Sequence, residues 1–230
     1  MTVSRRLVLG LAMLVCGVAT MAHAETAAGP AAYVVAYLEA GTSRTAEAAA
    51  LLRQIAAASR HEAGNAFYDV FEEIGRPTRF AVVSGWYDKA AIAAHQRAVA
   101  ASGLAAKLQA LLASPPDVRP STALAVAPAT ARAPTAVYVL THVDVVPPAK
   151  DRAIGLLERL AEDSRKESGV LFFDVLQQDS RPNHLTLFAA WRSPQAFEAH
   201  RTAANTRAFR DALLPLQGAL YDERLYRALE

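Results

Sequence analysis

The stretch Ser59-Arg60-His61-Glu62-Ala63-Gly64 returns 105 residues later (164 − 59) as Ser164-Arg165-Lys166-Glu167-Ser168-Gly169. The same shift needs no gap to superimpose landmarks on either side of it: Tyr33 on Tyr138, Phe67 on Phe172, Asp69 on Asp174, Arg76-Pro77 on Arg181-Pro182, Trp86 on Trp191 and His95 on His200. A period this long indicates a duplicated domain, because the units of solenoid proteins span roughly 20 to 50 residues. The 230-residue chain therefore contains two copies of one domain, each of about 100 residues.

Both copies show the same order of expected elements. The first copy opens with a β-rich run at 33–38, followed by a helix of about 17 residues with a 3.6-residue apolar period, which ends at Gly64. A hairpin of two strands, one continuous second helix and a closing strand complete the copy. In the first copy the hairpin strands are expected at 66–72 and 79–86, the second helix at 92–111 and the closing strand at 118–126. In the second copy the first strand is expected at 137–143, the hairpin strands at 171–177 and 184–191, the second helix at 197–216 and the closing strand at 220–229.

The order β-α-β-β-α-β is the split arrangement of ferredoxin-like α+β domains. Its helices cover one face of the sheet, so the opposite face must be buried by another part of the protein. We expect the two copies to pack these free faces together within the chain, as an intrachain pseudo-dimer. The predicted domains cover 31–126 and 136–230, and an Ala- and Pro-rich linker at 127–135 joins them in a semi-extended form.

Composition and charge restrict the partners of the chain. With 53% hydrophobic and 20% charged residues, each copy can build its own core. The formal net charge of +2 is spread along the sequence, so there is no electrostatic reason to expect a nucleic-acid partner.

Residues 1–24 are predicted to be a signal peptide. Arg5-Arg6 precede the apolar run Leu7–Thr20, and Ala22-His23-Ala24 forms a small-residue cleavage site before Glu25. The alternative is a membrane anchor, but the apolar run is shorter than the roughly 20 residues that a span requires. We expect a periplasmic or secreted protein without a stable membrane span after cleavage, exported by the Sec or the twin-arginine route.

Cleavage would also remove Cys16, the only cysteine of the chain. The mature protein would then have no disulfide, no cysteine nucleophile and no Cys-ligated metal, as suits an oxidising compartment.

The repeated motifs resemble those of the antibiotic biosynthesis monooxygenase domain family. They are Ser-Arg-x-Glu-x-Gly, an aromatic-acidic-Val strand, Arg-Pro, a strand that ends in Trp, and Ala-His nine residues after that Trp. The resemblance covers nearly all of the mature chain twice, and it implies the fold of the dimeric α+β barrels. The family includes enzymes that oxidise hydroquinones and anthrone-like polyphenols with O2 and no cofactor, as well as haem-degrading members and quorum-signal isomerases.

The haem-degrading branch departs from this sequence. In that branch a Trp stands where His95 and His200 lie here, and the haem-ligating His follows ten residues later, where this chain has Ala105 and Arg210. The resemblance therefore implies a cofactor-independent monooxygenase that acts on a quinol or polyphenol, with a small aromatic substrate and O2 as its partners. Two alternatives remain: a non-catalytic periplasmic small-molecule-binding or stress-response protein, and an isomerase of the same fold.

His95 and His200 are the candidate catalytic bases. Each lies three residues after an apolar residue, Ile92 or Phe197, and so shares the sheet-facing stripe of its helix. An imidazole directed into an apolar layer needs a partner or a ligand, and histidine is the natural base near neutral pH. The alternative is a core histidine that is hydrogen-bonded to the backbone.

Candidate substrate-binding residues lie on the two hairpin strands. Trp86 and Trp191 could form walls on which an aromatic substrate stacks, although plain packing also explains them. Tyr68 could donate a hydrogen bond to a substrate in the first copy, whereas the second copy has Phe173. His142 and His184 occur only in the second copy, and no ligand spacing supports a metal site there.

Overall fold

The computed structural model describes residues 29–127, termed half 1 here, and 133–229, termed half 2. The predicted signal peptide and most of the predicted linker lie outside the described residues. Within them, none of the helices has the length and apolar character needed to cross a membrane.

Each half contains the expected β-α-β-β-α-β unit. Half 1 consists of β1 (Ala32–Glu39), α1 (Thr45–Ser59), β2 (Asn65–Glu73), β3 (Arg79–Trp86), α2 (Lys89–Ala101), α3 (Leu104–Gln109) and β4 (Asp117–Ala125). Half 2 consists of β5 (Val137–Asp144), α4 (Lys150–Ser164), β6 (Val170–Gln178), β7 (His184–Trp191), α5 (Pro194–Thr202), α6 (Ala204–Leu213) and β8 (Asp222–Ala228). Three short 3₁₀ turns, η1 (Thr42–Arg44), η2 (Pro147–Ala149) and η3 (Leu214–Leu216), complete the described elements.

The expected continuous second helix is wrong in both halves, because the chain breaks it into two. In half 1 the break is at Gly103, whose φ of 72° is left-handed and leaves the α-helical region. In half 2 the break is at Ala203, which is extended with φ −65° and ψ 150°. Each break lets the chain turn, so that α3 contacts α1 and α6 contacts α4.

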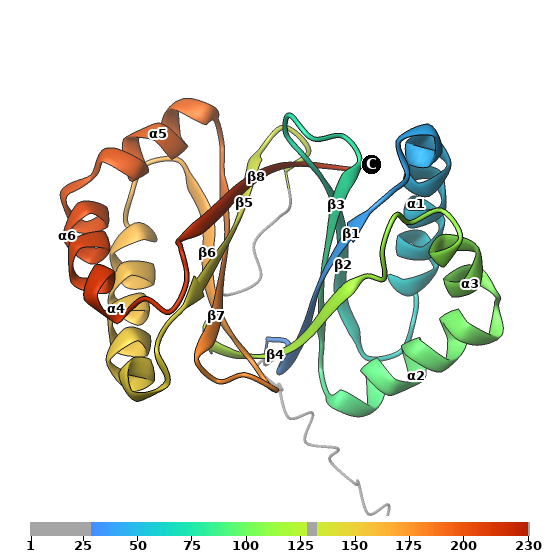
Figure 1. The fold of residues 1–230 in the computed structure, drawn as a ribbon, viewed down its shortest axis with the longest axis horizontal. Coiled ribbons are helices and arrows are strands. Elements are labelled where there is room, and N and C mark those ends of the chain that lie inside the picture. The colour runs from blue at the N-terminus through green and yellow to red at the C-terminus, as the bar shows by residue number, and fades with distance from the viewer. Residues whose placement is uncertain (1–28, 128–132, 230) are drawn as a thin grey trace, which may run out of the picture.

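The eight strands form one closed antiparallel barrel in the order β1-β3-β2-β8-β5-β7-β6-β4. The last strand of each half joins the two sheets: β4 pairs with β1 and with β6 of half 2, and β8 pairs with β5 and with β2 of half 1. The helices of the two halves lie on opposite outer sides of the barrel (Figure 1). The predicted intrachain barrel is therefore confirmed, and closure removes the sheet edges that separate domains would expose.

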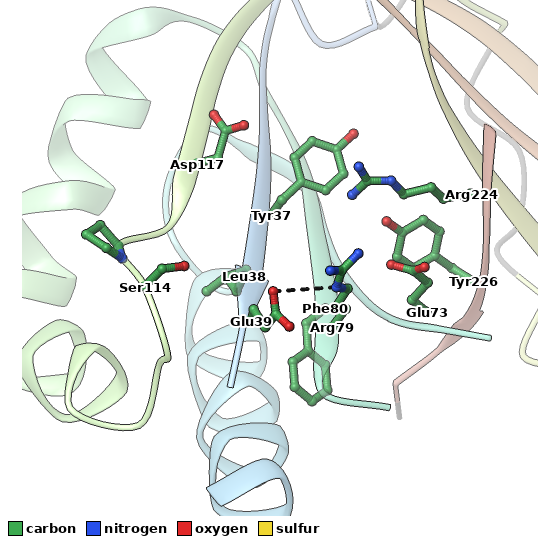
Figure 2. A pocket seen from close by; sticks show the side chains of 11 residues that line it. Tyr37, Leu38, Glu39, Glu73, Arg79, Phe80, Ser114, Asp117, Arg224 and Tyr226 are labelled. Atoms are coloured by element: carbon green, nitrogen blue, oxygen red, sulfur yellow. Dashed lines mark ion pairs between the residues drawn. The ribbon is translucent and has the colours of Figure 1, made fainter. Parts of the chain in front are cut away.

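The barrel interior has an apolar core and a polar end. Aromatic rings fill the core, among them Phe71, Tyr138 and Phe188, which are all at most 1% exposed. The polar end lies where β1 and β2 finish and β3 and β4 begin. It holds a cavity of about 230 Å³, which is lined by charged and hydroxyl side chains (Figure 2): Tyr37, Glu39, Glu73, Arg79, Asp117, Arg224 and Tyr226.

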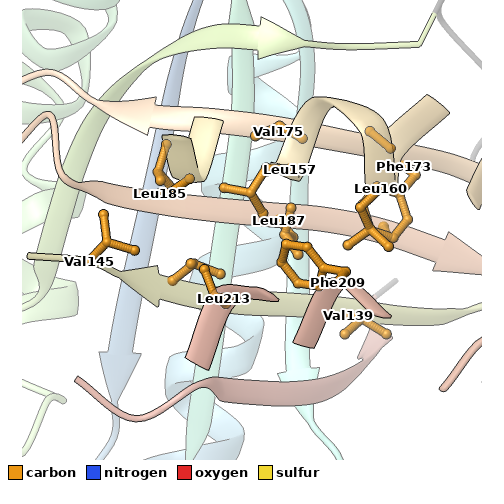
Figure 3. Packing of buried hydrophobic residues seen from close by; sticks show 14 of the residues in the cluster. Val139, Val145, Leu157, Leu160, Phe173, Val175, Leu185, Leu187, Phe209 and Leu213 are labelled. Carbon is orange, nitrogen blue, oxygen red and sulfur yellow. The ribbon is translucent and has the colours of Figure 1, made fainter. Parts of the chain in front are cut away.

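A second type of core lies between each sheet and its own helices. In half 2, Leu157 and Leu160 of α4 and Phe209 and Leu213 of α6 pack onto the outer face of the sheet (Figure 3). The matching cluster of half 1 includes Leu52 and Ile55 of α1. The predicted catalytic histidines lie at the edge of these two outer cores, and not inside the barrel.

Candidate active site

The repeated Ser-Arg-x-Glu-x-Gly stretch forms the turn that leads from α1 into β2. Ser59 is fully buried and its hydroxyl donates to the carbonyl oxygen of Ile55 at 2.8 Å. The Arg60 side chain donates from Nε to the carbonyl oxygen of Tyr68 at 2.9 Å, which ties the end of the helix to the neighbouring strand. This turn directs the Glu62 carboxylate toward α2, where His95 lies.

Glu62 and His95 form a carboxylate–imidazole pair. Nδ1 of His95 lies 3.0 Å from Oε2 and 3.2 Å from Oε1 of Glu62, and 3.4 Å from the Ser59 hydroxyl. A carboxylate accepts only, so the pair favours the tautomer with a proton on Nδ1 and a lone pair on Nε2. Such a pair can accept a proton at Nε2, and the carboxylate then stabilises the imidazolium.

Two aromatic rings hold the His95 imidazole in place. The Tyr68 ring centroid lies 5.4 Å from that of His95, and the Trp86 centroid lies 4.9 Å from it. Trp86 is fully buried and its indole Nε1 donates to the Ser84 hydroxyl at 2.9 Å. Burial raises the pKa of Tyr68 to about 12, and the Glu62 charge adds to that effect, so the hydroxyl stays protonated and can donate to a ligand.

His95 and Tyr68 line a cavity of about 290 Å³ between the sheet and the helices of half 1. Its walls are mostly apolar and come from all the elements around it: Val34, Ala36, Leu38, Leu52, Ile55, Val82, Ile92, Val99, Ala105, Leu108, Leu112, Pro116 and Val118. A few polar groups, Ser84, Gln96 and Gln109, interrupt this lining. An apolar pocket with few polar groups is the usual form of a small-molecule site.

Half 2 repeats the pair with more internal hydrogen bonds. His200 Nδ1 lies 3.1 Å from Oε2 of Glu167, and the Thr206 hydroxyl lies 3.3 Å from the same nitrogen. Asn205 also donates to Glu167 at 2.8 Å. Burial lowers the pKa of His200 below its ordinary value, although Glu167 opposes that shift.

The cavity beside His200 is almost closed. Its volume is about 10 Å³, against about 290 Å³ in half 1. Trp191 stacks on His200 with ring centroids 4.5 Å apart, and its Nε1 has no hydrogen-bond partner among the described residues, since Ala189 stands where half 1 has Ser84. Phe173 lies 5.6 Å from His200 between ring centroids.

The structure thus brings the six candidate residues together as two separate trios: His95 with Tyr68 and Trp86, and His200 with Phe173 and Trp191. Trp86 lies behind His95 and is not among the residues that line the half 1 cavity. The roles of these residues toward a substrate stay predictions. Sequence reasoning missed Glu62 and Glu167 as partners of the histidines, although both belong to the motif that repeats at a shift of 105 residues (167 − 62).

The histidines of half 2 that suggested a metal site lie in other surroundings. His142 accepts a hydrogen bond at Nδ1 from Arg119 at 2.8 Å, and His184 pairs with Asp144 at 2.9 Å. Burial and the neighbouring Arg119 and Arg224 lower the pKa of His142 to about 4. In the part of the chain that the structure describes, no three His, Cys, Asp or Glu side chains gather in a way that could hold a metal ion.

Comparison with known proteins identifies the family. The antibiotic biosynthesis monooxygenase family profile matches residues 31–106 and 136–212. The Bacillus subtilis (strain 168) protein named "Putative monooxygenase YcnE" is 34% identical over 83 residues, which cover 36% of this chain and 87% of that protein. This chain belongs to the antibiotic biosynthesis monooxygenase family and carries two copies of its domain.

Solved structures agree with the fold. A Fusobacterium nucleatum protein described as a "Putative monooxygenase" superimposes with a TM-score of 0.78 at 14% identity, over 87% of this chain and 93% of that one. One from Lactobacillus acidophilus NCFM gives a TM-score of 0.72 at 11% identity, over 87% and 95% of the two chains. A structure described as an anthrone oxidase-like protein gives 0.67 at 13% identity, over 87% and 92%.

Proposed function

We propose that the protein is an exported, cofactor-independent monooxygenase that oxidises a quinol or polyphenol with O2 in the half 1 cavity. The observation that carries this proposal is the Glu62–His95 pair at the edge of an apolar cavity of about 290 Å³. Membership of the monooxygenase family supports the reaction type. The apolar lining favours a flat aromatic substrate over a sugar-like one.

The first step of the proposed reaction is removal of the phenolic proton. Nε2 of His95 accepts that proton, and Glu62 stabilises the imidazolium that forms. The Tyr68 hydroxyl can donate to a substrate oxygen as negative charge develops on it. Exclusion of water by the apolar walls strengthens both interactions.

The second step is electron transfer from the phenolate to O2. The phenolate gives one electron to O2, and the resulting superoxide and phenoxyl radical combine at a ring carbon that carries hydrogen. The peroxide takes the proton back from the imidazolium and becomes a hydroperoxide. Loss of water from that carbon leaves a quinone carbonyl, so one oxygen atom of O2 enters the product and the other leaves as water.

A second candidate function is a non-catalytic small-molecule-binding protein. The observation that favours it is the Glu167–His200 pair, which persists in half 2 beside a cavity of only about 10 Å³. A pair that is retained without room for a ligand contributes to packing and hydrogen bonding. The same contribution would account for the pair in half 1.

Oxygen uptake by the purified protein against a panel of quinols and anthrones separates the two functions. With ¹⁸O2, the monooxygenase reaction gives a product that carries one labelled oxygen atom and water that carries the other. Uptake no faster than autoxidation, together with tight binding of the same compounds, would leave the binding protein as the better account.

Export is a separate part of the proposal. It is based on the sequence of residues 1–24, and its test is the intact mass of protein recovered from the periplasm or medium. A mass that begins at Glu25 supports it, whereas a retained or lipidated N-terminus contradicts it.

A further inference from the structure

Three equivalent positions differ strongly in size and charge between the two cavities. The 105-residue shift places Arg210 on Ala105, Tyr221 on Pro116 and Glu223 on Val118 (for example, 223 − 118). The half 1 residues at all three positions line the open cavity, and each is small or uncharged. Their half 2 counterparts are large, and two of them are charged.

Arg210 contacts both Tyr221 and Glu223 in half 2. Tyr221 and Glu223 line the remaining cavity of about 10 Å³ together with His200. Arg210 pairs with Glu223 at 3.0 Å, and its guanidinium lies 5.0 Å from the Tyr221 ring centroid. We call Arg210, Tyr221 and Glu223 the plug.

The rest of half 2 is adjusted to the plug. Tyr221 hydrogen-bonds with the side chain of Thr141, which replaces Ala36 of half 1. Arg201 replaces Gln96 and reaches Glu223 at 3.3 Å. The changes at these facing positions match one another and form one network. A closed cavity explains such matched changes better than unrelated substitutions would.

The hydrogen bonding of the plug is incomplete. Arg210 Nε has no hydrogen-bond partner among the described residues, so the network leaves one buried donor unsatisfied. Arg201 has a second partner, since it also pairs with Glu198 at 3.0 Å. Removal of Arg210 and Glu223 together would therefore leave no buried charge without a partner.

We propose that half 2 contains a second, latent site for an apolar ligand, next to the intact Glu167–His200 pair, and that the plug of Arg210, Tyr221 and Glu223 keeps it shut. The wild-type chain then holds one such ligand, in half 1. Replacement of these three side chains by small apolar ones, like those at the equivalent positions of half 1, opens the second cavity. This inference depends on packing alone and goes beyond the proposed function.

Xenon is the probe for the test, because it enters dry apolar cavities and needs no proton transfer. We expect crystals of the protein under xenon pressure to show xenon in the half 1 cavity and none beside His200. The triple variant Arg210→Ala, Tyr221→Ala, Glu223→Val should show xenon in both places. Xenon beside His200 in the wild-type protein, or none there in the folded triple variant, would overturn the proposal.

A reciprocal variant keeps the proposal testable if the opened protein does not fold. Ala105→Arg, Pro116→Tyr, Val118→Glu transfers the plug to half 1 and should remove the xenon from that cavity. Xenon that persists in the half 1 cavity of this folded variant would show that the three side chains do not close it. Because xenon binding is independent of turnover, either result stands apart from the outcome of the quinol assay.

Discussion

At the scale of single residues, Glu62 is the side chain that orients the His95 imidazole. Its carboxylate lies 3.0 and 3.2 Å from Nδ1, which favours the tautomer with a proton on Nδ1 and a lone pair on Nε2. His200 has the same partner in Glu167 but almost no cavity beside it. The two halves therefore provide matched controls for substitutions of the histidine and of its glutamate partner.

We expect Glu62→Gln to lower kcat for quinol oxidation by about 10²–10⁴-fold, because the imidazolium loses the charge that stabilises it. KM should change little, since the amide keeps the shape of the carboxylate. The matched variant Glu167→Gln should leave kcat within about twofold, because its histidine has no room for a substrate. Steady-state oxygen uptake checks both, and an equal loss of rate in the two variants would contradict the assignment.

His142 should make the protein sensitive to mild acid. Its pKa is lowered to about 4 by burial and by Arg119 and Arg224, while the carboxylates of Asp222 and Asp117 oppose the shift. An unfolded chain binds the proton at an ordinary pKa of about 6.5, so this stability is complete above that pH and is lost as the pH falls toward 4. The difference between the folded and unfolded pKa of His142 corresponds to about 3 kcal/mol of stability. The lowered pKa of His200 also makes the folded protein less stable as the pH falls.

Urea unfolding at pH 7.5 and pH 5 measures this loss. His142→Gln should show a smaller loss of stability between the two pH values than the wild-type protein. The exposed His61 gives a control, since His61→Gln should keep the full loss. A pH dependence that is unchanged by His142→Gln would show that the buried imidazole does not control it.

Residue roles were only partly predictable from the sequence. The spacing of His95 after Ile92 was enough to place its side chain between helix and sheet. Glu62 was interpreted as a helix-end residue, because its partner lies 33 residues away (95 − 62) and no local pattern connects them. The unequal cavities depend on packing volume, although Tyr221 and Glu223 opposite Pro116 and Val118 are a visible difference between the copies.

At the scale of elements, the turn between α1 and β2 sets the distance between Glu62 and His95. Gly64 has a left-handed φ of 81°, and a Cβ added there would lie 2.6 Å from the Cβ of Ala91 on α2. Gly169 makes the same close approach to Ala196, at 2.6 Å. A glycine is thus required both by the backbone conformation and by the contact with α2.

Gly64→Ala should therefore destabilise the protein by more than about 2 kcal/mol, because left-handed strain and the collision with α2 add. It should also reduce turnover, since the collision would push α2, and His95 with it, away from Glu62. Gly103→Ala is the control: its φ is 72°, but among the described residues no atom apart from those of its chain neighbours lies within 4 Å of the added Cβ, so it should cost only about 1 kcal/mol. Urea denaturation measures both, and equal costs would contradict the close contact.

Element order was predictable because the apolar periods of helices and strands differ. The strands β3 at 79–86 and β7 at 184–191 match their predicted ranges, whereas the second helix was predicted as one piece. In half 1 a glycine inside the helical pattern, Gly103, indicated the break, whereas the alanine at the break of half 2, Ala203, did not. Its extended backbone is compatible with any residue, so composition does not reveal it.

At the scale of the whole molecule, the last strand of each half makes the barrel one unit. β4 and β8 each pair with strands of both halves, so neither half completes its own sheet edges. We expect each half, expressed alone, to aggregate or to form a two-chain barrel, because it exposes interior residues such as Val35 and Phe71. Light scattering after size exclusion checks this, and a stable monomeric half would contradict it.

Duplication made the pseudo-dimer predictable, since two sheets with one free face each have one simple way to bury it. Which strands would pair across the halves was not predictable, because pairing depends on the path of the chain after α3 and α6. The division into an open and a closed site is likewise a property of the assembled molecule.

We propose that half 1 holds the working site and that His95 is its base. The most direct test is quinol-dependent oxygen uptake by His95→Ala and His200→Ala, each confirmed to be folded. Loss of a positioned base should lower kcat/KM of His95→Ala by about 10²–10⁴-fold. His200→Ala should stay within about twofold of the wild-type protein. The claim is contradicted if His95→Ala keeps its rate, or if His200→Ala loses as much as His95→Ala.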